Sequence, residues 1–309
     1  MSIHQQIQDV CPKSDTALAI GTFDGIHVGH QSLFKQLLQE AFRSDLQTMV
    51  LTFRNHPRSI LDPTSEVQYI MPWEERERCI KSLGIDTVVP LEFTPKMARL
   101  RAHDFVANLV SDLRMRVLVA GPDFALGHNR EGDIGALKKW GADMDFQVSV
   151  ANLEILGDRP ASSRGIRNMI SEGDVESATQ MLGRFPTLTG LVVRGDRRGR
   201  ELGFPTANIA SEQGILVPCN GIYATWIILD GKRYPSATSI GVRPTFGSGD
   251  RSVETFILNF DSEIYGEEVT LQFVSRLREE LAFSTVDALV QQMHLDVEKA
   301  KEVLRKCDA

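Results

Sequence analysis

Short apolar runs alternate with amphipathic stretches over the first half of the chain. The apolar runs lie at residues 17–23, 48–53, 86–93, 117–124 and 146–153. Between them, residues 30–42 and 71–84 carry apolar side chains at helical spacing. This alternation predicts βαβ units around a parallel sheet. Because ligands bind beyond the carboxyl ends of parallel strands, the residues that directly follow each run are the first candidates for a site.

The pattern changes in the second half of the chain. Alternating apolar and polar residues, separated by glycine-rich turns, occupy residues 188–196, 221–231, 236–242, 252–260 and 268–277. These segments predict antiparallel strands. From Ser284 to Leu304 the helical spacing returns, and Ser284 with Asp287 resembles a capping box. The predicted fold class is therefore α/β, with a parallel-sheet domain over residues 1–184 and an antiparallel β-barrel with a terminal helix over residues 185–309.

Composition places the chain among ordinary folded proteins. Its 309 residues suffice for two domains, and 42% apolar with 24% charged residues exclude a disordered, collagen-like or coiled-coil chain. The formal net charge is −7 and no long basic run is present, so nucleic acid is not expected as a partner.

Neither export nor a membrane is predicted. No apolar stretch approaches the length of about 18 residues that a spanning helix needs, and residues 1–15 lack the pattern of a signal peptide. The four cysteines, at positions 11, 79, 219 and 307, lie far apart without paired spacing. We therefore expect reduced thiols in a cytoplasmic protein, with no disulfide or zinc framework.

The first candidate site follows the first apolar run. The chain turns through Gly21 and Gly25 and opens a helix near Gly29, with His27 and His30 at that junction. A helix N-terminus attracts phosphate, Gly29 lets the backbone approach a nucleotide, and two imidazoles can donate hydrogen bonds to phosphate oxygens as charge develops. This arrangement predicts attack on a nucleotide phosphorus without a covalent enzyme intermediate. The alternative is that both histidines cap a turn or bind a metal.

The longer string over residues 21–30, G-x-F-D-G-x-H-x-G-H, resembles the FMN adenylyltransferase module of bacterial bifunctional riboflavin kinase/FAD synthetases. That module belongs to the H-x-G-H nucleotidyltransferases and has a Rossmann-like fold. The resemblance implies that nucleotide-binding positions include Gly21, Phe23, Asp24 and Gly29, with the two histidines as catalytic residues.

Two later segments are similar to the same module. His56 lies in a segment like the family's T-F-x-P-H-P turn, where Asn55 replaces the first proline. Asp123 lies in a segment like G-x-D-F-x-F-G-x-x-R-x-G-D, where Leu126 replaces the usual aromatic residue. The resemblance implies that His56 and Asp123 line the nucleotide cleft. The alternative for the second segment is a solvated polar loop.

A third segment, over residues 161–167, is similar to the family's S-S-T-x-I-R motif, which grips the triphosphate. Ser162 and Ser163 are expected to cap a helix that starts near Ile166, and Arg167 can pair with phosphate through two hydrogen bonds. Arg164 replaces the family's threonine. This exchange removes a small hydroxyl donor and adds a long cation, so it would weaken adenylyl transfer or rearrange the triphosphate grip.

The second candidate site lies at the start of the predicted barrel. Gly195 and Gly199 allow a tight loop to fold over phosphate. Thr206 and Asn208 lie two residues apart on extended backbone, so their oxygen atoms point the same way and can share a Mg²⁺ ion. The alternative is that the glycines form ordinary hairpin turns. The joined string over residues 199–208, G-R-x-L-G-F-P-T-A-N, resembles the riboflavin kinase domain and implies ATP binding here.

A kinase also needs a base to accept the proton of the attacking hydroxyl. Strand alternation places Glu254 on one face with Phe256 and Leu258, where the carboxylate would meet the apolar interior and burial would raise its pKa. The alternative is an exposed glutamate at a strand end. The resemblance places Glu254 at the family's catalytic glutamate, after a G-x-R-P-T-F segment at 241–246, and implies that it activates the ribityl 5′-hydroxyl of riboflavin.

Two residues further along the chain match the family's L-R-x-E-x-x-F segment. The resemblance implies that Arg278 and Phe283 frame the mouth of a flavin site. The alternative is that they only pack a strand against the terminal helix.

The resemblance covers residues 19–300, with motifs of both halves in the family's order. It implies a bifunctional transferase of FMN and FAD biosynthesis. The barrel would convert riboflavin and ATP to FMN and ADP, and the α/β domain would convert FMN and ATP to FAD and pyrophosphate. Both reactions imply Mg²⁺. The expected partners are these small molecules alone, acting on a monomer or weak homo-oligomer.

Three alternatives stay open. The first is an active kinase whose adenylyltransferase half is impaired by the departures at Asn55, Leu126 and Arg164. The second is a non-catalytic flavin-binding regulatory paralogue. The third is a different H-x-G-H enzyme, such as a pantetheine-phosphate or glycerol-phosphate nucleotidyltransferase, in which the 205–208 motif is unexpected.

Overall fold

The computed structural model describes residues 3–152, 155–156, 159–195, 199, 202–242 and 251–308. The chain forms two compact units, one of residues 1–67 with 73–162 and the other of residues 68–72 with 163–309. The segment 163–184 therefore belongs to the same unit as the barrel, whereas the predicted functional boundary at 184/185 stays a prediction.

The first unit is built on a five-stranded parallel sheet with strand order β3-β2-β1-β4-β7, as the alternation of runs and helices predicts. Its strands are β1 (Thr16–Gly21), β2 (Gln47–Phe53), β3 (Thr87–Leu91), β4 (Met115–Ala120) and β7 (Gln147–Val150). The order of strands along the chain reverses between β1 and β4. A ligand crevice is expected at the carboxyl ends of these two strands.

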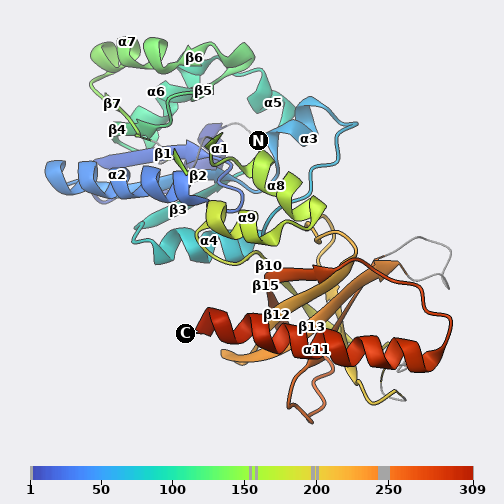
Figure 1. Ribbon diagram of the computed structural model, residues 1–309. Coiled ribbons are helices and arrows are strands. Elements are labelled where there is room, and N and C mark those ends of the chain that lie inside the picture. The colour runs from blue at the N-terminus through green and yellow to red at the C-terminus, as the bar shows by residue number, and fades with distance from the viewer. Residues whose placement is uncertain are drawn as a thin grey trace. The chain divides into compact units, whose positions relative to one another are not determined.

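Helices cover this sheet, and Figure 1 shows α2 lying along it. They are α1 (Ile3–Ile7), α2 (Val28–Ser44), α3 (Pro57–Leu61), α4 (Trp73–Ser82), α5 (Pro95–Ala98), α6 (Ala102–Asp112) and α7 (Ile134–Met144). The described part of the unit also contains two short hairpins, β5 (Ala125–Leu126) with β6 (Gly132–Asp133) and β8 (Ile155–Leu156) with β9 (Arg159–Pro160), and a 3₁₀ turn, His128–Arg130. Helix α2 buries Leu33, Phe34, Leu37 and Ala41, whose spacing of three to four residues places them on one face.

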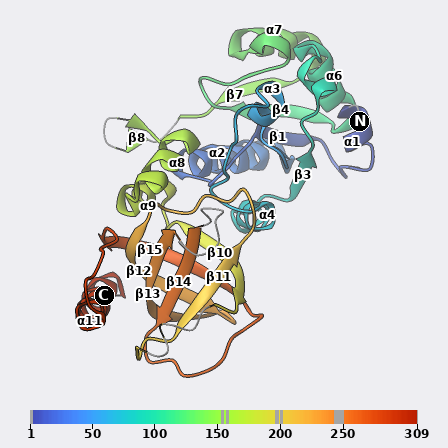
Figure 2. The same cartoon turned by 90° about the vertical axis from the view of Figure 1, so that its right-hand side faces the viewer.

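The second unit contains a closed antiparallel barrel with strand order β10-β11-β14-β13-β12-β15. The strands are β10 (Thr187–Val193), β11 (Thr206–Ser211), β12 (Gly221–Leu229), β13 (Lys232–Val242), β14 (Arg251–Ile257) and β15 (Glu268–Arg278). Figure 2 shows β11, β14 and β13 side by side in the barrel wall. Because the barrel is closed, each of these described strands pairs with a neighbour on both sides.

The helices described in the second unit include α8 (Ser163–Glu172), α9 (Val175–Leu182) and α11 (Val286–Asp308). Helix α11 packs on the outside of β12, β13 and β15 (Figure 1). The prediction that Ser284 caps the start of this helix is wrong. The hydroxyl of Thr285, one residue later, accepts a hydrogen bond from the backbone N–H of Ala288. Thr285 is therefore the residue that caps this helix.

Two further observations concern the whole described part of the chain. No helix in it is both long enough and apolar enough to cross a membrane. The four cysteines are free thiols.

Candidate active sites

The turn that follows β1 has an unusual backbone. Phe23 and Ile26 have φ angles of 49° and 40°, in the left-handed region, which costs a residue with a side chain about 1–2 kcal/mol. The ring of Phe23 folds back over Gly21, where a Cβ atom would lie 2.8 Å from the ring Cζ. Glycine at position 21 is therefore required by the close approach of this ring, and the surrounding contacts must hold the turn in place.

His27 and His30 lie together where this turn enters α2. Their rings stack with centroids 3.6 Å apart, and the ring of Phe23 meets His30 edge-on at 5.1 Å. His27 caps α2, because its Nδ1 accepts a 3.4 Å hydrogen bond from the backbone N–H of His30. This bond places the proton of neutral His27 on Nε2, where it can be donated to a ligand. Of the alternative that both histidines cap a turn, the structure bears out His27 alone, which caps α2, and such a cap is compatible with a catalytic role.

Burial sets the charge of this pair. Desolvation of the His30 ring, and secondarily the neighbouring His27, holds the pKa of His30 well below its usual range. Within the described residues, His30 Nδ1 is buried without a hydrogen-bond partner. Gly29 leaves room for this packing, since a Cβ atom there would lie 3.2 Å from the Cε1 and Nδ1 atoms of His27. Asp24, in the same turn, is 1% exposed.

The loop after β2 brings His56 to the same edge of the sheet. His56 caps α3, where its Nδ1 accepts a 3.1 Å hydrogen bond from the backbone N–H of Arg58. The departure at Asn55 has a structural role, because its side chain forms two hydrogen bonds with the backbone of Phe93, at 2.8 and 2.7 Å. The Asn55 side chain therefore holds this loop against the segment that follows β3. In the family's motif, a proline at this position would instead restrict the backbone of the loop.

The loop after β4 contains Asp123, whose side chain is exposed. Its backbone carbonyl accepts a 3.0 Å hydrogen bond from Arg130. Leu126 is partly buried against the core of the first unit, so the departure from an aromatic residue keeps an apolar contact. Neither Asn55 nor Leu126 disrupts the local structure.

A cavity of about 750 Å³ opens at this edge of the sheet, beside Gly21 and Thr22. Sequence reasoning did not identify it, although each of three apolar runs ends on a phenylalanine that lines it. The apolar and aromatic part of its lining includes Phe53, Phe93, Met97, Phe105, Phe124 and Leu126. Phe53 and Phe93 meet edge to face, with centroids 5.5 Å apart. Such a cavity suits a planar aromatic ligand.

The helix in segment 161–167, the segment expected to bind the triphosphate, starts earlier in the chain than predicted. Helix α8 starts at Ser163, not near Ile166, so Ser163 lies within its first turn and Ser162 is exposed just before it. Arg167 lies four residues after Ser163 and shares its face of the helix, and both are half-buried. Arg164 is exposed, and nothing in the structure explains its replacement of threonine. It stays a prediction that polyphosphate is bound by Ser162, Ser163 and Arg167.

The predicted kinase residues meet on two neighbouring strands. Asn208 of β11 lies directly opposite Glu254 of β14. The hydroxyl of Thr206 donates a 3.4 Å hydrogen bond to the Oε2 atom of Glu254. Three oxygen-bearing side chains therefore share one face of the barrel wall, as the spacing of Thr206 and Asn208 predicts.

The position of Glu254 differs from prediction in one respect. Val253, Thr255 and Ile257 are buried toward the inside of the barrel, and the hydroxyl of Thr255 is paired there with that of Thr238 at 2.9 Å. Glu254 lies on the opposite, outer face and is half-buried. The expectation that its carboxylate faces the apolar interior is wrong, because β14 belongs to a closed barrel whose inner face is the other one.

The glycines of the loop after β10 lie against these residues. A Cβ atom on Gly195 would overlap the side-chain amide of Asn208. One on Gly199 would overlap the backbone carbonyl of Phe204 and lie 3.4 Å from the hydroxyl of Thr206. Both glycines are therefore needed for close approach. The intervening residues 196–198, and residues 243–246 of the predicted 241–246 motif, lie outside the described part of the chain.

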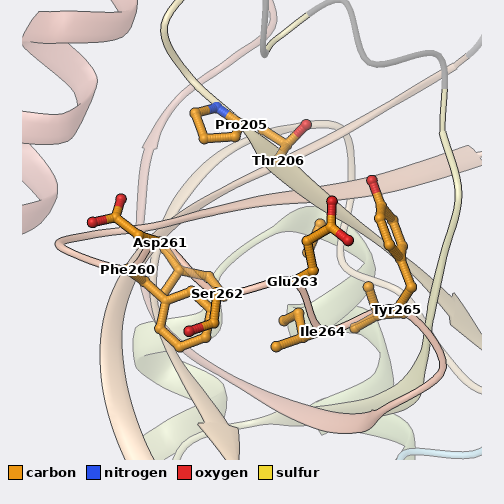
Figure 3. Close-up of a pocket in the computed structure, with 11 residues that line it drawn as sticks. Pro205, Thr206, Phe260, Asp261, Ser262, Glu263, Ile264 and Tyr265 are labelled. Atoms are coloured by element: carbon orange, nitrogen blue, oxygen red, sulfur yellow. The ribbon is translucent and has the colours of Figure 1, made fainter.

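A cavity of about 270 Å³ adjoins Thr206. Figure 3 shows the side chains of Glu263 and Tyr265 pointing toward Thr206 across it. The guanidinium carbon of Arg194 lies 5.7 Å from the centroid of the Tyr265 ring. The cavity thus combines an aromatic ring, a nearby cation and the hydroxyl of Thr206.

Arg278 and Phe283 are packed between a strand and a helix. Arg278 forms a salt bridge of 2.6 Å with Asp296 of α11, and its guanidinium carbon lies 6.0 Å from the ring of Phe283. These contacts show that Arg278 joins β15 to α11, as the packing alternative expects of this residue. A contact with flavin stays a prediction.

Comparison with known proteins decides the family. The FAD synthetase family matches residues 11–164, and the riboflavin kinase family matches residues 182–304. A bifunctional riboflavin kinase/FMN adenylyltransferase of Listeria monocytogenes is 37% identical over 293 residues, covering 94% of this chain and 93% of its relative. This chain belongs to the bifunctional riboflavin kinase/FMN adenylyltransferase family.

Other relatives agree with this assignment. The Bacillus subtilis protein of the same name is 32% identical over 303 residues, covering 96% of this chain and 94% of its own. A crystal structure from Streptococcus pneumoniae, described as a macrolide-efflux protein, superposes with a TM-score of 0.90 at 31% identity and covers 96% of this chain and 97% of its own.

Proposed function

We propose that this chain phosphorylates riboflavin to FMN in its barrel and then adenylylates FMN to FAD in its parallel-sheet unit. One observation supports the proposal: each compact unit brings together a different group of residues that are expected to act on phosphate. The first unit has the stacked pair His27 and His30 at the start of a helix, and the second has Thr206 and Asn208 beside Glu254.

In the kinase reaction, Glu254 accepts the proton of the ribityl 5′-hydroxyl, whose oxygen attacks the γ-phosphorus of ATP and releases ADP. The half-buried carboxylate can receive a substrate hydroxyl from outside the barrel because it lies on the outer face. Thr206, with Glu263 and Tyr265 across the 270 Å³ cavity, supports binding of the nucleotide there.

The donors beside Glu254 fit Mg²⁺. The hydroxyl of Thr206, the amide oxygen of Asn208 and the carboxylate are hard oxygen ligands, which this cation prefers. Within the described ranges, no group of three or more His, Cys, Asp or Glu side chains could hold a metal, so phosphate oxygens and water would complete the coordination. When bound, Mg²⁺ neutralises charge on the polyphosphate.

In the adenylyl transfer, an FMN phosphate oxygen attacks the α-phosphorus of ATP, and the bond to pyrophosphate breaks. The Nε2–H group of His27, with His30 beside it, donates hydrogen bonds to the α-phosphate oxygens. The N-terminus of α2 adds the positive end of its helix dipole. By the family resemblance, Ser162, Ser163 and Arg167 would bind the leaving pyrophosphate, and His56 and Asp123 would line the nucleotide cleft.

The aromatic cavity accounts for the choice of acceptor. Its volume of about 750 Å³ and its phenylalanine lining suit an isoalloxazine ring better than pantetheine phosphate or glycerol phosphate, which are flexible and non-aromatic. We place the flavin of FMN there, with its phosphate directed toward Gly21 and the histidine pair.

The experiment is to supply the protein with riboflavin and Mg-ATP, or with FMN and Mg-ATP, and to separate the products by chromatography. We expect FMN followed by FAD in the first case, and FAD with pyrophosphate in the second. FMN without FAD would indicate the impaired adenylyltransferase, and unchanged substrates with bound flavin would indicate a non-catalytic module.

We further propose a cytoplasmic location and a monomer or weak homo-oligomer.

A further inference from the structure

Arg76 of α4 is an unexpected residue to find buried. It is 1% exposed and is the largest fully buried side chain in the described part of the chain. A guanidinium group keeps its charge at physiological pH, so its burial is unfavourable unless its N–H groups are used. Arg76 Nη1 donates a 2.7 Å hydrogen bond to the backbone carbonyl of Thr22, and the guanidinium carbon lies 5.1 Å from the centroid of the Trp73 ring.

The carbonyl of Thr22 lies where β1 ends and the turn toward the histidine pair begins. Thr22 directly follows the last residue of β1, lines the aromatic cavity and precedes the left-handed Phe23. Its carbonyl also accepts a 3.0 Å hydrogen bond from the hydroxyl of Thr52, a fully buried residue of β2. A helix and a strand therefore both hold this one oxygen atom.

The turn beyond Thr22 depends on such anchors. Phe23, Gly25 and Ile26 have φ angles of 49°, 79° and 40°, and the next residue is His27. A turn with this backbone relaxes toward more favourable angles when its supports are removed. Any relaxation would move the imidazole of His27 and, through their stacked rings, that of His30.

We propose that Arg76 is a positioning residue for adenylyl transfer. Its guanidinium fixes the Thr22 carbonyl and thereby the turn that presents His27 and His30 to the α-phosphate; this inference rests on the proposed role of the two histidines. Arginine suits the task because its planar fork donates a hydrogen bond while it stacks on the Trp73 ring. A lysine can reproduce the charge, but it cannot both donate this hydrogen bond and stack on the Trp73 ring.

The test compares Arg76→Met, Arg76→Lys and Thr52→Val, with both activities measured on the full chain. Methionine fills similar space without charge and removes the hydrogen bond to the Thr22 carbonyl. We expect Arg76→Met to lower kcat for FAD formation about 100-fold, a loss typical of a misplacement near 1 Å, with KM for FMN unchanged. Riboflavin phosphorylation should stay at its normal rate.

Arg76→Lys and Thr52→Val should each give a smaller loss of the same kind. An unchanged kcat in Arg76→Met overturns the proposal. So does a parallel loss of both activities with a lower melting temperature, because the arginine would then serve stability alone. If Arg76→Met does not fold, unchanged kcat values in the other two variants overturn the proposal, and selective losses support it.

His27→Ala and His30→Ala, measured in parallel, separate the positioning role of Arg76 from the role of the histidines themselves. If they retain FAD formation, the proposed role of the histidine pair is wrong, and the positioning role falls with it. If they lose FAD formation while the Arg76 variants keep it, only the positioning role is wrong.

Discussion

Asn208 and Glu254 lie directly opposite each other on two neighbouring antiparallel strands, with the Thr206 hydroxyl 3.4 Å from the same carboxylate. Side chains that face each other across such a pair point to one side of the sheet. The pairing therefore places a base next to two cation ligands on one rigid surface, and the glycine loop at Gly195 lies against the amide of Asn208.

Asn208→Ala should weaken the cation site without removing the base. We expect the Mg²⁺ concentration for half-maximal FMN formation to rise about tenfold, corresponding to about 1.4 kcal/mol. FAD formation from supplied FMN should keep its Mg²⁺ dependence, and Asn108→Ala on α6 is the control for loss of an amide elsewhere. An equal shift in both activities would show that Asn208 does not belong to the kinase site alone.

Gly29→Ala should impair FAD formation selectively. The added methyl group would lie 3.2 Å from the His27 ring and displace it, and a displacement of this kind costs about 10–100-fold in rate. The matched control is Gly135→Ala, the second residue of α7 as Gly29 is of α2, where the nearest atom outside the neighbouring residues is 3.4 Å away. Equal kcat values for the two variants would contradict the role of the histidine pair.

The salt bridge between Arg278 and Asp296 should stabilise the second unit. The two side chains are 18% and 9% exposed, so removing one partner leaves a largely buried charge. We expect Asp296→Ala to lower the free energy of unfolding by about 3 kcal/mol, measured by denaturant titration. The double variant Arg278→Met with Asp296→Leu should recover most of this loss. Should the double variant be no more stable than Asp296→Ala, the explanation by an uncompensated charge is incorrect.

Stability should depend on pH through His30. The unfolded chain binds a proton at the usual histidine pKa near 6.5, whereas burial and the neighbouring His27 lower the pKa of His30 in the folded protein. Stability is therefore complete above about pH 6.5 and falls below it, by at most about 1.4 kcal/mol per pH unit for this group. His30→Gln should reduce the slope between pH 5 and pH 6.5, measured by denaturant titration at a series of pH values. If the free energy of unfolding of the wild type and of His30→Gln depended on pH with the same slope, His30 would not be the source of this pH dependence.

Much of the architecture follows from the sequence because the local signals and the fold agree. The apolar runs become β1, β2, β3, β4 and β7, and the alternating segments become barrel strands. The H-x-G-H turn and the 205–208 segment also carry chemistry within short stretches. The histidine pair and the Thr206–Asn208 pair can therefore be found from the amino-acid sequence alone.

The remaining features depend on contacts between distant segments. The inner face of β14 is decided by barrel closure, so alternation alone could not show that Glu254 lies outside. The aromatic cavity needs three strand ends to converge, and the contact between Arg76 and Thr22 joins residues 54 positions apart.

The most direct test of the central claim is complementation between two single-site variants supplied with riboflavin and Mg-ATP. Glu254→Gln alone should make no FMN, and His30→Ala alone should accumulate FMN without FAD. An equimolar mixture of the two should restore FAD formation, because one variant releases the FMN that the other adenylylates. Loss of both activities in either variant, or a mixture that forms no FAD, would contradict two separate phosphorus-transfer sites in this chain.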